Sequence, residues 1–552
     1  MPMPDRFRVS EFARQHKGWT SISLLSAACV VLPILSVFWN GLRPANENWA
    51  HIRRHMLWDH VPPTIRLVVF ACAASAMLGA ALAWLVAAYD FPLRRLFRWA
   101  LALPLAIPPY IAAYTYGNLL SYTGIVQQTL RGMGVRANPA WFDIMSEPGA
   151  VFIFTMFLYP YVFLITRAYL EKSGGSYVEN ARLLGRSGLP LFLRVVLPIS
   201  RPALAGGAAL VAYETLSDYG VVNYYGIQTL TIAIFKTWFG MYDIESATRL
   251  GALFLAGILA VVVLERLLRR RRRYSETTGR GAPLKPVRLR GAKAALATAA
   301  CLAALAVAFL IPVAQLAQWA GWTFESVALR ADFGRLAVNT LQASLLATAL
   351  ILAVSVIVAN TVRMARSGLH AAIAKLLTAG YAIPGPIIAI GVLSLFIALD
   401  RLLAPLYAGM GRGAAPLVLS LSLAMLIAGY VVRFMATGYN AVESGFERIG
   451  MKYAEASRTL GAGLTRTFFA VDLPMIRGPL LGGAALTFVE IAKELPLTML
   501  LRPFNFDTLA TKAYQYAGDE RIYQAAAPSL MIIGIGLASV FILHHMAGSG
   551  QK

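Results

Sequence analysis

Long runs of apolar residues, separated by short polar stretches, dominate the chain from end to end. A helix needs about 20 mostly apolar residues to cross the ~30 Å hydrocarbon core of a bilayer. Segments of this kind lie near residues 22–40, 64–88, 97–120, 149–170, 202–222, 247–267, 294–319, 337–361, 372–399, 415–440, 478–500 and 525–545. The pattern therefore predicts an all-α polytopic membrane protein with about 12 transmembrane helices.

The composition supports this prediction. Of the 552 residues, 58% are hydrophobic and 14% are charged, whereas soluble proteins have about 45–50% apolar and about 25% charged residues. The three cysteines lie far apart in apolar stretches, which argues against a disulfide framework or a zinc site. The first apolar run has no small-residue cleavage site after it, so we expect it to be retained as the first helix.

The charge is strongly positive, because 50 Lys and Arg residues face 27 Asp and Glu residues, a net charge of +23. In a soluble protein this excess would suggest a nucleic-acid partner. Here the basic residues gather in alternate loops: Arg94, Arg95, Arg98, Arg363, Arg366, Lys375 and the run Arg269–Arg273. The positive-inside rule places these loops and both termini in the cytoplasm. We expect contact with the lipid bilayer and no nucleic-acid partner.

The second half of the chain repeats the first at a constant offset of 276 residues. The matches include Ala106-Ile107-Pro108-Pro109 with Ala382-Ile383-Pro384-Gly385, Gly206–Leu210 with Gly482–Leu486, and Glu214 and Asp218 with Glu490 and Glu494. Each half has six predicted spans, an even number, so both halves enter the membrane in the same direction. The sequence predicts two parallel six-helix units, residues 1–268 and 293–552, joined by a basic cytoplasmic linker at 269–292.

Between the fourth and fifth spans, each half has a polar loop with the same spacing. The two copies are Glu179-Asn180-Ala181, Gly185 and Leu197-Pro198, and Glu455-Ala456-Ser457, Gly461 and Leu473-Pro474. This order is typical of a short helix, a glycine turn and a second helical piece. A glycine that merely ends a helix would fit a single copy, but two copies with one spacing favour a functional loop.

These loops resemble the EAA loop of permease subunits of binding-protein-dependent ABC importers. Val195 and Val471 stand where that family typically has Ile, and Asn180 and Ser457 each replace an alanine. In the family this loop forms a coupling helix that docks on a separate cytoplasmic ATPase. The resemblance implies a type I-like permease fold with ATPase-coupling residues Glu179, Ala181, Gly185, Pro198, Glu455, Ala456, Gly461 and Pro474.

A nucleotide site of the chain's own is not expected. The phosphate-binding loop of such ATPases has the pattern G-x-x-x-x-G-K-[ST], and no Gly-Lys dipeptide occurs in the sequence. No catalytic triad or metal-ligand cluster stands out. We therefore expect a transport subunit that is not an enzyme and has no cofactor, with ATP and Mg²⁺ bound by the partner ATPase.

Four acids fall inside predicted spans. Glu214 lies twelve residues after Pro202, about 18 Å along a helix and past the middle of the membrane, and Asp218 is predicted one turn further on the same face. Glu490 and Glu494 repeat the pair, with Lys493 between them. Because a charge at the centre of a span costs roughly 2.5–3.5 kcal/mol, these groups must face the interior. In one interpretation these acids form ion pairs with Lys493 or Arg433 that only stabilise the helix bundle. In the other, which we favour, the charged residues form a translocation path or gate made of Glu214, Asp218, Glu490, Lys493 and Glu494.

Two further stretches resemble fused ferric-iron permeases, a likeness that covers essentially the whole chain. They are Glu214–Gly220 with Gln228–Leu230 and Lys236–Gly240, and Lys493–Pro496 with Leu501–Ala510. The resemblance implies a multi-pass inner-membrane Fe³⁺ importer, supplied by an extracytoplasmic iron-binding protein and driven by a homodimeric ATPase. No stable metal site is expected; iron would bind only transiently, at Glu214, Asp218, Glu490 and Glu494.

Other substrates and one other class remain open at this point. Fused thiamine permeases share the architecture, and unfused relatives carry phosphonates, polyamines or sulfate. An ion-coupled secondary transporter could also have repeats and buried acids. The paired EAA-like loops argue against it, because such a carrier has no ATPase to dock.

Overall fold

The chain folds into a bundle of helices, as the apolar pattern predicts. A computed structural model describes residues 17–135, 138–173, 175–270, 283–365, 367–409, 417–420 and 422–549. Within these ranges the extended structure is one parallel pair of two-residue strands, β1 (Tyr89–Asp90) and β2 (Val287–Arg288). The predicted all-α class is confirmed.

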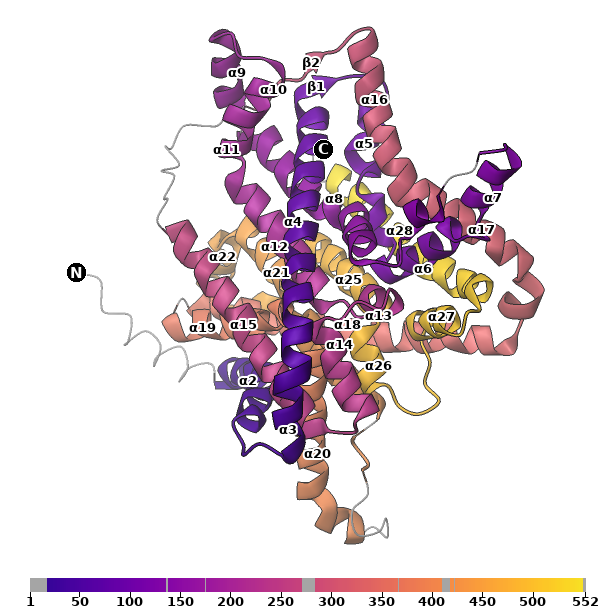
Figure 1. Ribbon diagram of the computed structural model, residues 1–552. Coiled ribbons are helices and arrows are strands. Elements are labelled where there is room, and N and C mark those ends of the chain that lie inside the picture. Colours follow the sequence, from indigo (N-terminus) through magenta and orange to yellow (C-terminus); the bar gives the residue numbers. More distant parts are fainter. Residues whose placement is uncertain are drawn as a thin grey trace.

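The first half contains the following helices. They are α2 (Lys17–Gly41), α3 (Glu47–His51), α4 (Leu57–Ala88), α5 (Arg94–Ala100), α6 (Pro109–Leu120), α7 (Ile125–Gly132), α8 (Glu147–Ser173), α9 (Gly175–Leu183), α10 (Gly188–Leu191), α11 (Leu197–Ile199), α12 (Arg201–Ser217), α13 (Gly220–Tyr224), α14 (Leu230–Phe235) and α15 (Ile244–Arg270). Short π- or 3₁₀-helical turns join several of them, and α4 runs almost the full height of the molecule (Figure 1).

The second half contains an equivalent set. It consists of α16 (Ala292–Leu305), α17 (Ile311–Trp322), α18 (Ala331–Ala365), α19 (Gly368–Thr378), α20 (Gly385–Gly409), α21 (Leu423–Ile449), α22 (Lys452–Thr459), α23 (Leu464–Thr467), α24 (Leu473–Met475), α25 (Arg477–Ala492), α26 (Pro496–Leu501), α27 (Leu509–Gly518) and α28 (Ile522–Ser549). Helices α8 and α21, and likewise α12 and α25, begin 276 residues apart. The repeat seen in the sequence is therefore a structural repeat.

The predicted spans correspond to helices of the structure. Seven helices of the described chain are long and apolar enough to cross a membrane, or ten if each of three bent pairs is one span. The remaining two predicted spans, 247–267 and 415–440, correspond to α15 and α21, each a helix of 27 residues. Arg433 lies within the apolar stretch of α21 and lowers its hydropathy.

Proline explains two differences between the predicted and observed spans. The segment 97–120 bends by 89° between Arg94–Ala106 and Pro109–Gly132, because Pro108 and Pro109 cannot continue the preceding turn. The segment 372–399 similarly divides at Pro384 into α19 and α20. Only α20 is long and apolar enough for a span.

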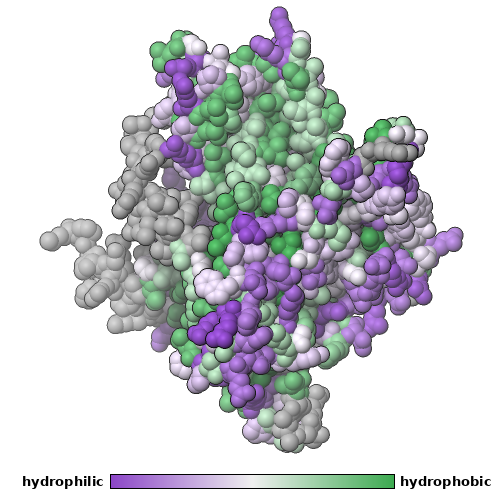
Figure 2. Space-filling model, in the orientation of Figure 1, coloured by the Kyte–Doolittle hydropathy of each residue, from purple (hydrophilic) through white to green (hydrophobic). Residues whose placement is uncertain are grey.

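Each half is built around three helices in close contact, α4, α8 and α12 in the first and α18, α21 and α25 in the second. Glycine permits the close approach: a Cβ on Gly207 would lie 2.7 Å from Val162, and a Cβ on the equivalent Gly483 would lie 2.7 Å from Ala441. The halves also interlock, since α2 packs against α18 and α20 of the second unit. Figure 2 shows the resulting apolar surface over α4 and α16.

One hydrogen bond occurs in both halves and fixes the short helices beyond the spans. The hydroxyl of Thr64 accepts a bond of 2.9 Å from the amide of Leu230, at the start of α14. The hydroxyl of Thr340 accepts the equivalent bond of 2.8 Å from the amide of Leu509, at the start of α27. The two units therefore share fine structure as well as architecture.

The predicted linker falls mainly outside the described residues. Arg271–Arg273 and Arg280 lie there, as do Arg366 and the first sixteen residues of the chain. From residue 283 onward the linker is described: it forms β2 and leads into α16.

Candidate functional site

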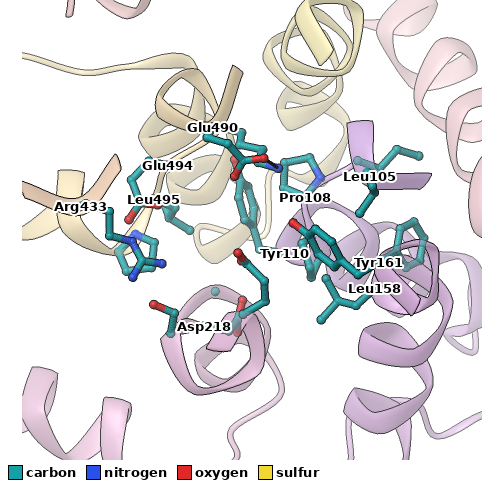
Figure 3. Close-up of a pocket in the computed structure, with 18 of the residues that line it drawn as sticks. Leu105, Pro108, Tyr110, Leu158, Tyr161, Asp218, Arg433, Glu490, Glu494 and Leu495 are labelled. Carbon is teal, nitrogen blue, oxygen red and sulfur yellow. Dashed lines mark ion pairs between the residues drawn. The ribbon is translucent and has the colours of Figure 1, made fainter. Parts of the chain in front are cut away.

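A cavity of about 80 Å³ lies between the two units and brings together all five residues predicted for the translocation path (Figure 3). The first unit contributes Glu214 and Asp218, and the second contributes Glu490, Lys493 and Glu494. Arg433 of α21 also lines the cavity, together with Tyr110, Tyr161 and Tyr381. Four carboxyl groups and two basic groups thus surround one space at the interface of the repeats.

The acids lie where their helices end. Helix α12 stops at Ser217 and α25 stops at Ala492, so Asp218 and Glu494 are outside the long helices. The prediction that Asp218 continues the helical face of Glu214 is therefore wrong. The sequence contains the reason in the second unit, because Pro496 follows Glu494 and cannot continue a helix.

Asp218 and Glu494 share one structural role. The Oδ1 atom of Asp218 accepts a hydrogen bond of 2.8 Å from the amide of Val221 in α13. The Oε1 atom of Glu494 accepts a bond of 3.1 Å from the amide of Leu497, the equivalent residue in α26. A carboxylate in this position satisfies an amide that has no partner within its helix and interacts favourably with the helix dipole. Both acids therefore position short helices at the wall of the cavity.

Glu490 and Lys493 form an ion pair, with 2.8 Å between Oε1 and Nζ (Figure 3). The first unit has Ser217 at the position equivalent to Lys493, and its hydroxyl accepts a hydrogen bond of 3.0 Å from the amide of Gly385. That bond joins the end of α12 to the start of α20 in the other unit. The reciprocal bond cannot form, because the residue equivalent to Gly385 is Pro109, which has no amide hydrogen.

Glu214 has a different environment from its repeat partner. It makes no hydrogen bond or ion pair with another residue of the described chain, although it lines the same cavity as Lys493 and Arg433. The Arg433 guanidinium, a predicted pairing partner of the acids, instead donates to the carbonyl oxygen of Ile383 at 2.5 Å. Among the described residues, Glu214 is therefore the carboxyl group of the cavity without a hydrogen bond or an ion pair.

Aromatic residues connect the cavity to the short helices of both units. The ring of Tyr110 meets that of Tyr514 edge-on at 6.1 Å, and Tyr514 lies 5.9 Å from Tyr219. Tyr219 stacks on Phe235 of α14 at 3.8 Å. Tyr110, Tyr161 and Tyr381 were missed by sequence reasoning; the signal for Tyr110 was its place directly after the repeated proline motif at Ile107–Pro109.

The two EAA-like loops have the same backbone. Gly185 and Gly461 have φ angles of +80° and +85°, a left-handed conformation in which a side chain is strained. The amide of Arg186 bonds to the Ala181 carbonyl at 2.9 Å, and the amide of Ala462 bonds to the Ser457 carbonyl at 3.2 Å. This pattern is a glycine cap, which fixes α9 and α22 in matching orientations.

The predicted coupling residues are not equally accessible. Glu455, Ala456 and Pro474 are exposed, Glu179 and Pro198 are half-buried, and Ala181 is buried. Pro198 and Pro474 lie just before the bends of 76° and 72° that lead into α12 and α25. Ala181 therefore packs inside its loop, and the prolines belong to the elbows that connect the loops to the spans.

Exposed apolar side chains on the same loops were not predicted. Leu184 and its equivalent Leu460 are 84% and 88% exposed, and Tyr177 and Tyr453 are 55% and 53% exposed. Large apolar side chains that are exposed at matching positions indicate a contact surface for another protein. The signal in the sequence was Leu-Gly, which occurs in both copies.

Each loop is also supported by the segment that leads into the opposite unit. Leu284 of the linker is 7% exposed and packs in a cluster with Val178 and Ala181 of the first loop. At the start of α2, the ring of Trp19 lies 4.9 Å from that of Phe468, beside the second loop. The Trp19 indole also donates to the hydroxyl of Thr465 at 3.4 Å. We call these two contacts the cross-unit braces.

Comparisons with known proteins agree with this arrangement. The family described as "binding-protein-dependent transport system inner membrane component" matches residues 77–274 and 364–548. The chain is 24% identical over 490 residues to the Fe(3+)-transport system permease protein FbpB 2 of Haemophilus influenzae, covering 88% of this chain and 89% of that protein.

Two other relatives correspond to part of the chain. The sulfate transport system permease protein CysT of Salmonella typhimurium is 28% identical over 201 residues, 36% of this chain and 68% of that protein. The spermidine/putrescine transport system permease protein PotB of Escherichia coli is 26% identical over 181 residues, 33% of this chain and 65% of that protein.

Proposed function

Because the chain belongs to the family of binding-protein-dependent transport system inner membrane components, we propose that it is a two-unit permease of an ATP-driven importer of ferric iron. The observation that carries the proposal is the cavity between the units, where Glu214, Asp218, Glu490 and Glu494 meet. Membership of the family means a multi-pass inner-membrane protein that works with an ATPase and a binding protein. It sets aside the ion-coupled secondary transporter.

The chemistry of the cavity supports a hard cation as substrate. Carboxylate and phenol oxygens line it, and Fe³⁺ prefers oxygen ligands to sulfur. Among the described residues, no group of three or more His, Cys, Asp or Glu side chains could hold a metal ion. In this proposal the ion passes Glu214 and Glu490 without a resident site, and Lys493 and Arg433 limit how tightly it binds.

The relatives support the same substrate. The iron permease of Haemophilus influenzae aligns over both units, whereas the sulfate and polyamine permeases align over about one unit. A surplus of carboxyl groups also disfavours an anion such as sulfate. A polyamine is the second candidate, because it too is a cation that carboxylates attract.

The loops would couple this path to ATP hydrolysis. In this proposal Leu184 and Leu460 insert into a homodimeric ATPase that binds ATP and Mg²⁺, with Glu179 and Glu455 beside them. The glycine caps at Gly185 and Gly461 keep each loop rigid, and the elbows at Pro198 and Pro474 transmit its movement to α12 and α25. Both termini would lie on the cytoplasmic side with the ATPase.

The test is stimulation of the ATPase by substrate. The permease is co-purified with its ATPase and reconstituted in liposomes with binding proteins loaded with ferric iron, thiamine or spermidine. The proposal expects several-fold stimulation by the iron-loaded protein alone. If the spermidine-loaded protein stimulates instead, the substrate is wrong; if no ATPase co-purifies, the importer itself is wrong. The variant Glu455→Lys should lose stimulation and remain folded.

A further inference from the structure

A second, larger cavity lies along the C-terminal part of α2. It has a volume of about 1040 Å³ and opens where α2, α15 and α20 pass one another. Leu32, Leu35 and Trp39 form its apolar wall, and Arg43, Arg249 and Arg401 lie around its polar part. We call this space the basic groove. The start of α2 contacts the second EAA-like loop through Trp19. The groove lies at the other end of this helix, beside Trp39 and Arg43.

The helices that form the groove are held in close contact next to it. The Ser36 hydroxyl of α2 donates to the Gly391 carbonyl of α20 at 3.1 Å. A Cβ on Gly41 would lie 2.7 Å from Ala252 of α15. The groove is therefore formed by helices that pack closely against one another.

Its arginines are placed to receive an anion. The Arg249 guanidinium lies 5.1 Å from the centre of the Trp49 ring and donates to the Arg43 carbonyl oxygen. Within the described chain, neither Arg43 nor Arg401 forms an ion pair. Glu245 is the acidic residue among those that line the groove. Three positive charges and one negative charge leave the groove with an excess of positive charge.

The fold does not require these arginines. The positions equivalent to Arg43 and Arg401, at the offset of 276 residues, are Trp319 and Ile125. The stretch of α28 that corresponds to Arg249, residues 525–528, has no basic residue either. The basic residues are thus specific to one of the two repeats. Arginine is also depleted at the extracytoplasmic ends of spans. Three arginines around one cavity therefore indicate that an anion binds there.

The apolar wall identifies the kind of partner. Leu32, Leu35 and Trp39 are 48%, 54% and 70% exposed on a helix long and apolar enough to cross the membrane. Acyl chains cover such a surface, and the arginines lie at the end of the same helix, where phosphate headgroups begin. We propose that the basic groove binds an anionic phospholipid, with its phosphate between Arg43, Arg249 and Arg401 and an acyl chain along Leu32 and Leu35. This site is independent of the transported substrate.

Native mass spectrometry of the intact permease–ATPase complex tests the proposal. The complex is released from nanodiscs that contain phosphatidylglycerol and phosphatidylethanolamine. We expect one tightly retained phosphatidylglycerol, and the variant R43Q/R249Q/R401Q should hold it roughly 100-fold more weakly. The matched control R131Q/R330Q/R335Q changes exposed arginines elsewhere and should retain the lipid. The single variant R401Q should show part of the loss if the triple variant does not assemble.

Four results would overturn the proposal. Equal retention of phosphatidylglycerol by the groove and control variants would show that the lipid binds elsewhere. Equal retention of phosphatidylethanolamine would show that the groove does not select an anionic lipid. Displacement of the lipid by glycerol 3-phosphate alone would assign the site to a soluble phosphate. Weaker binding of the extracytoplasmic binding protein with unchanged lipid would assign the groove to protein docking.

Discussion

At the scale of single residues, side chains at matching positions of the two units do not all have the same role. Asp218 and Glu494 have the same structural role, because each accepts a hydrogen bond from a backbone amide of the helix that follows it. Glu214 and Glu490 differ, since only Glu490 has an ion-pair partner, Lys493. The repeat thus contributes two structural acids, one paired acid and one unpaired acid to the same cavity.

The unpaired acid should matter most for transport. We expect Glu214→Gln to reduce uptake of ferric iron into proteoliposomes at least tenfold, because it removes the one carboxyl group of the cavity that makes no hydrogen bond or ion pair within the described chain. The thermal stability should change little. Glu245→Gln, an exposed change in the basic groove, serves as the control. Normal uptake by Glu214→Gln would contradict a role for this carboxyl group in the path.

The paired acid should matter most for stability. Glu490→Gln leaves Lys493 as a largely buried cation without its partner, which typically costs about 3–5 kcal/mol. We therefore expect a clear drop in Tm, larger than that of Glu214→Gln. The double variant Glu490→Gln/Lys493→Met should recover much of the lost Tm, because it no longer has the unpaired Lys493 ammonium group. An unchanged Tm in the single variant would show that the pair is not needed for stability.

At the scale of elements, the coupling loops combine a rigid turn with an exposed apolar contact. Gly185 and Gly461 fix the turns through left-handed backbone conformations, and Leu184 and Leu460 stand beside them in solvent. The cross-unit braces then connect each loop to the segment that leads into the other unit. In the proposed coupling, movement of one loop would therefore reach the opposite half of the permease through these contacts.

The exposed leucines give a prediction about ATPase binding. Burying a leucine contributes about 1.5–3 kcal/mol, so Leu460→Ser should weaken ATPase binding roughly tenfold or more. The free permease should keep its stability, because this side chain is 88% exposed. Tyr242→Ser is a suitable control, since Tyr242 is 86% exposed outside the loops. Binding is measured with detergent-solubilised components, and an unaffected affinity would remove Leu460 from the interface.

The braces give a second prediction at this scale. Trp19→Ala and Leu284→Ala should each lower stimulation of the ATPase by the loaded binding protein while ATPase binding persists. The physical reason is that a loop without its brace can move without its opposite unit. Trp322→Ala, a change of a 62% exposed tryptophan away from the loops, is the control. Full stimulation in both brace variants would limit the braces to a packing role.

At the scale of the whole molecule, the two units depend on each other. Helix α2 packs on α18 and α20 of the other unit, and the cavity takes acids from both. Relatives such as the sulfate permease, which align over about one unit, indicate that a unit can be a separate chain.

This dependence predicts the behaviour of a divided chain. Co-expressed fragments 1–276 and 277–552 should co-purify and keep much of the transport activity, because the cut falls in the linker. Either fragment alone should aggregate, since it exposes the surfaces that pack on the other unit. A stable, monodisperse single fragment in size-exclusion chromatography would contradict this view.

The sequence by itself determined the class, the repeat and the residues that matter. Apolar runs required helices, and one constant offset required two parallel units, so Glu214 and Glu490 had to lie at matching depth and face the interior. The end of α12 at Ser217 could not be predicted, because nothing in the local pattern marks it, whereas Pro496 is a signal in the sequence for the end of α25.

Only the tertiary structure decided how those residues are used. It assigned Asp218 and Glu494 to helix ends, paired Glu490 with Lys493, and turned Arg433 toward a carbonyl group. It also brought Trp19 and Leu284 to the coupling loops of the opposite units, and three arginines to one groove. These outcomes depend on which helices lie side by side, and that is set by packing between residues hundreds of positions apart.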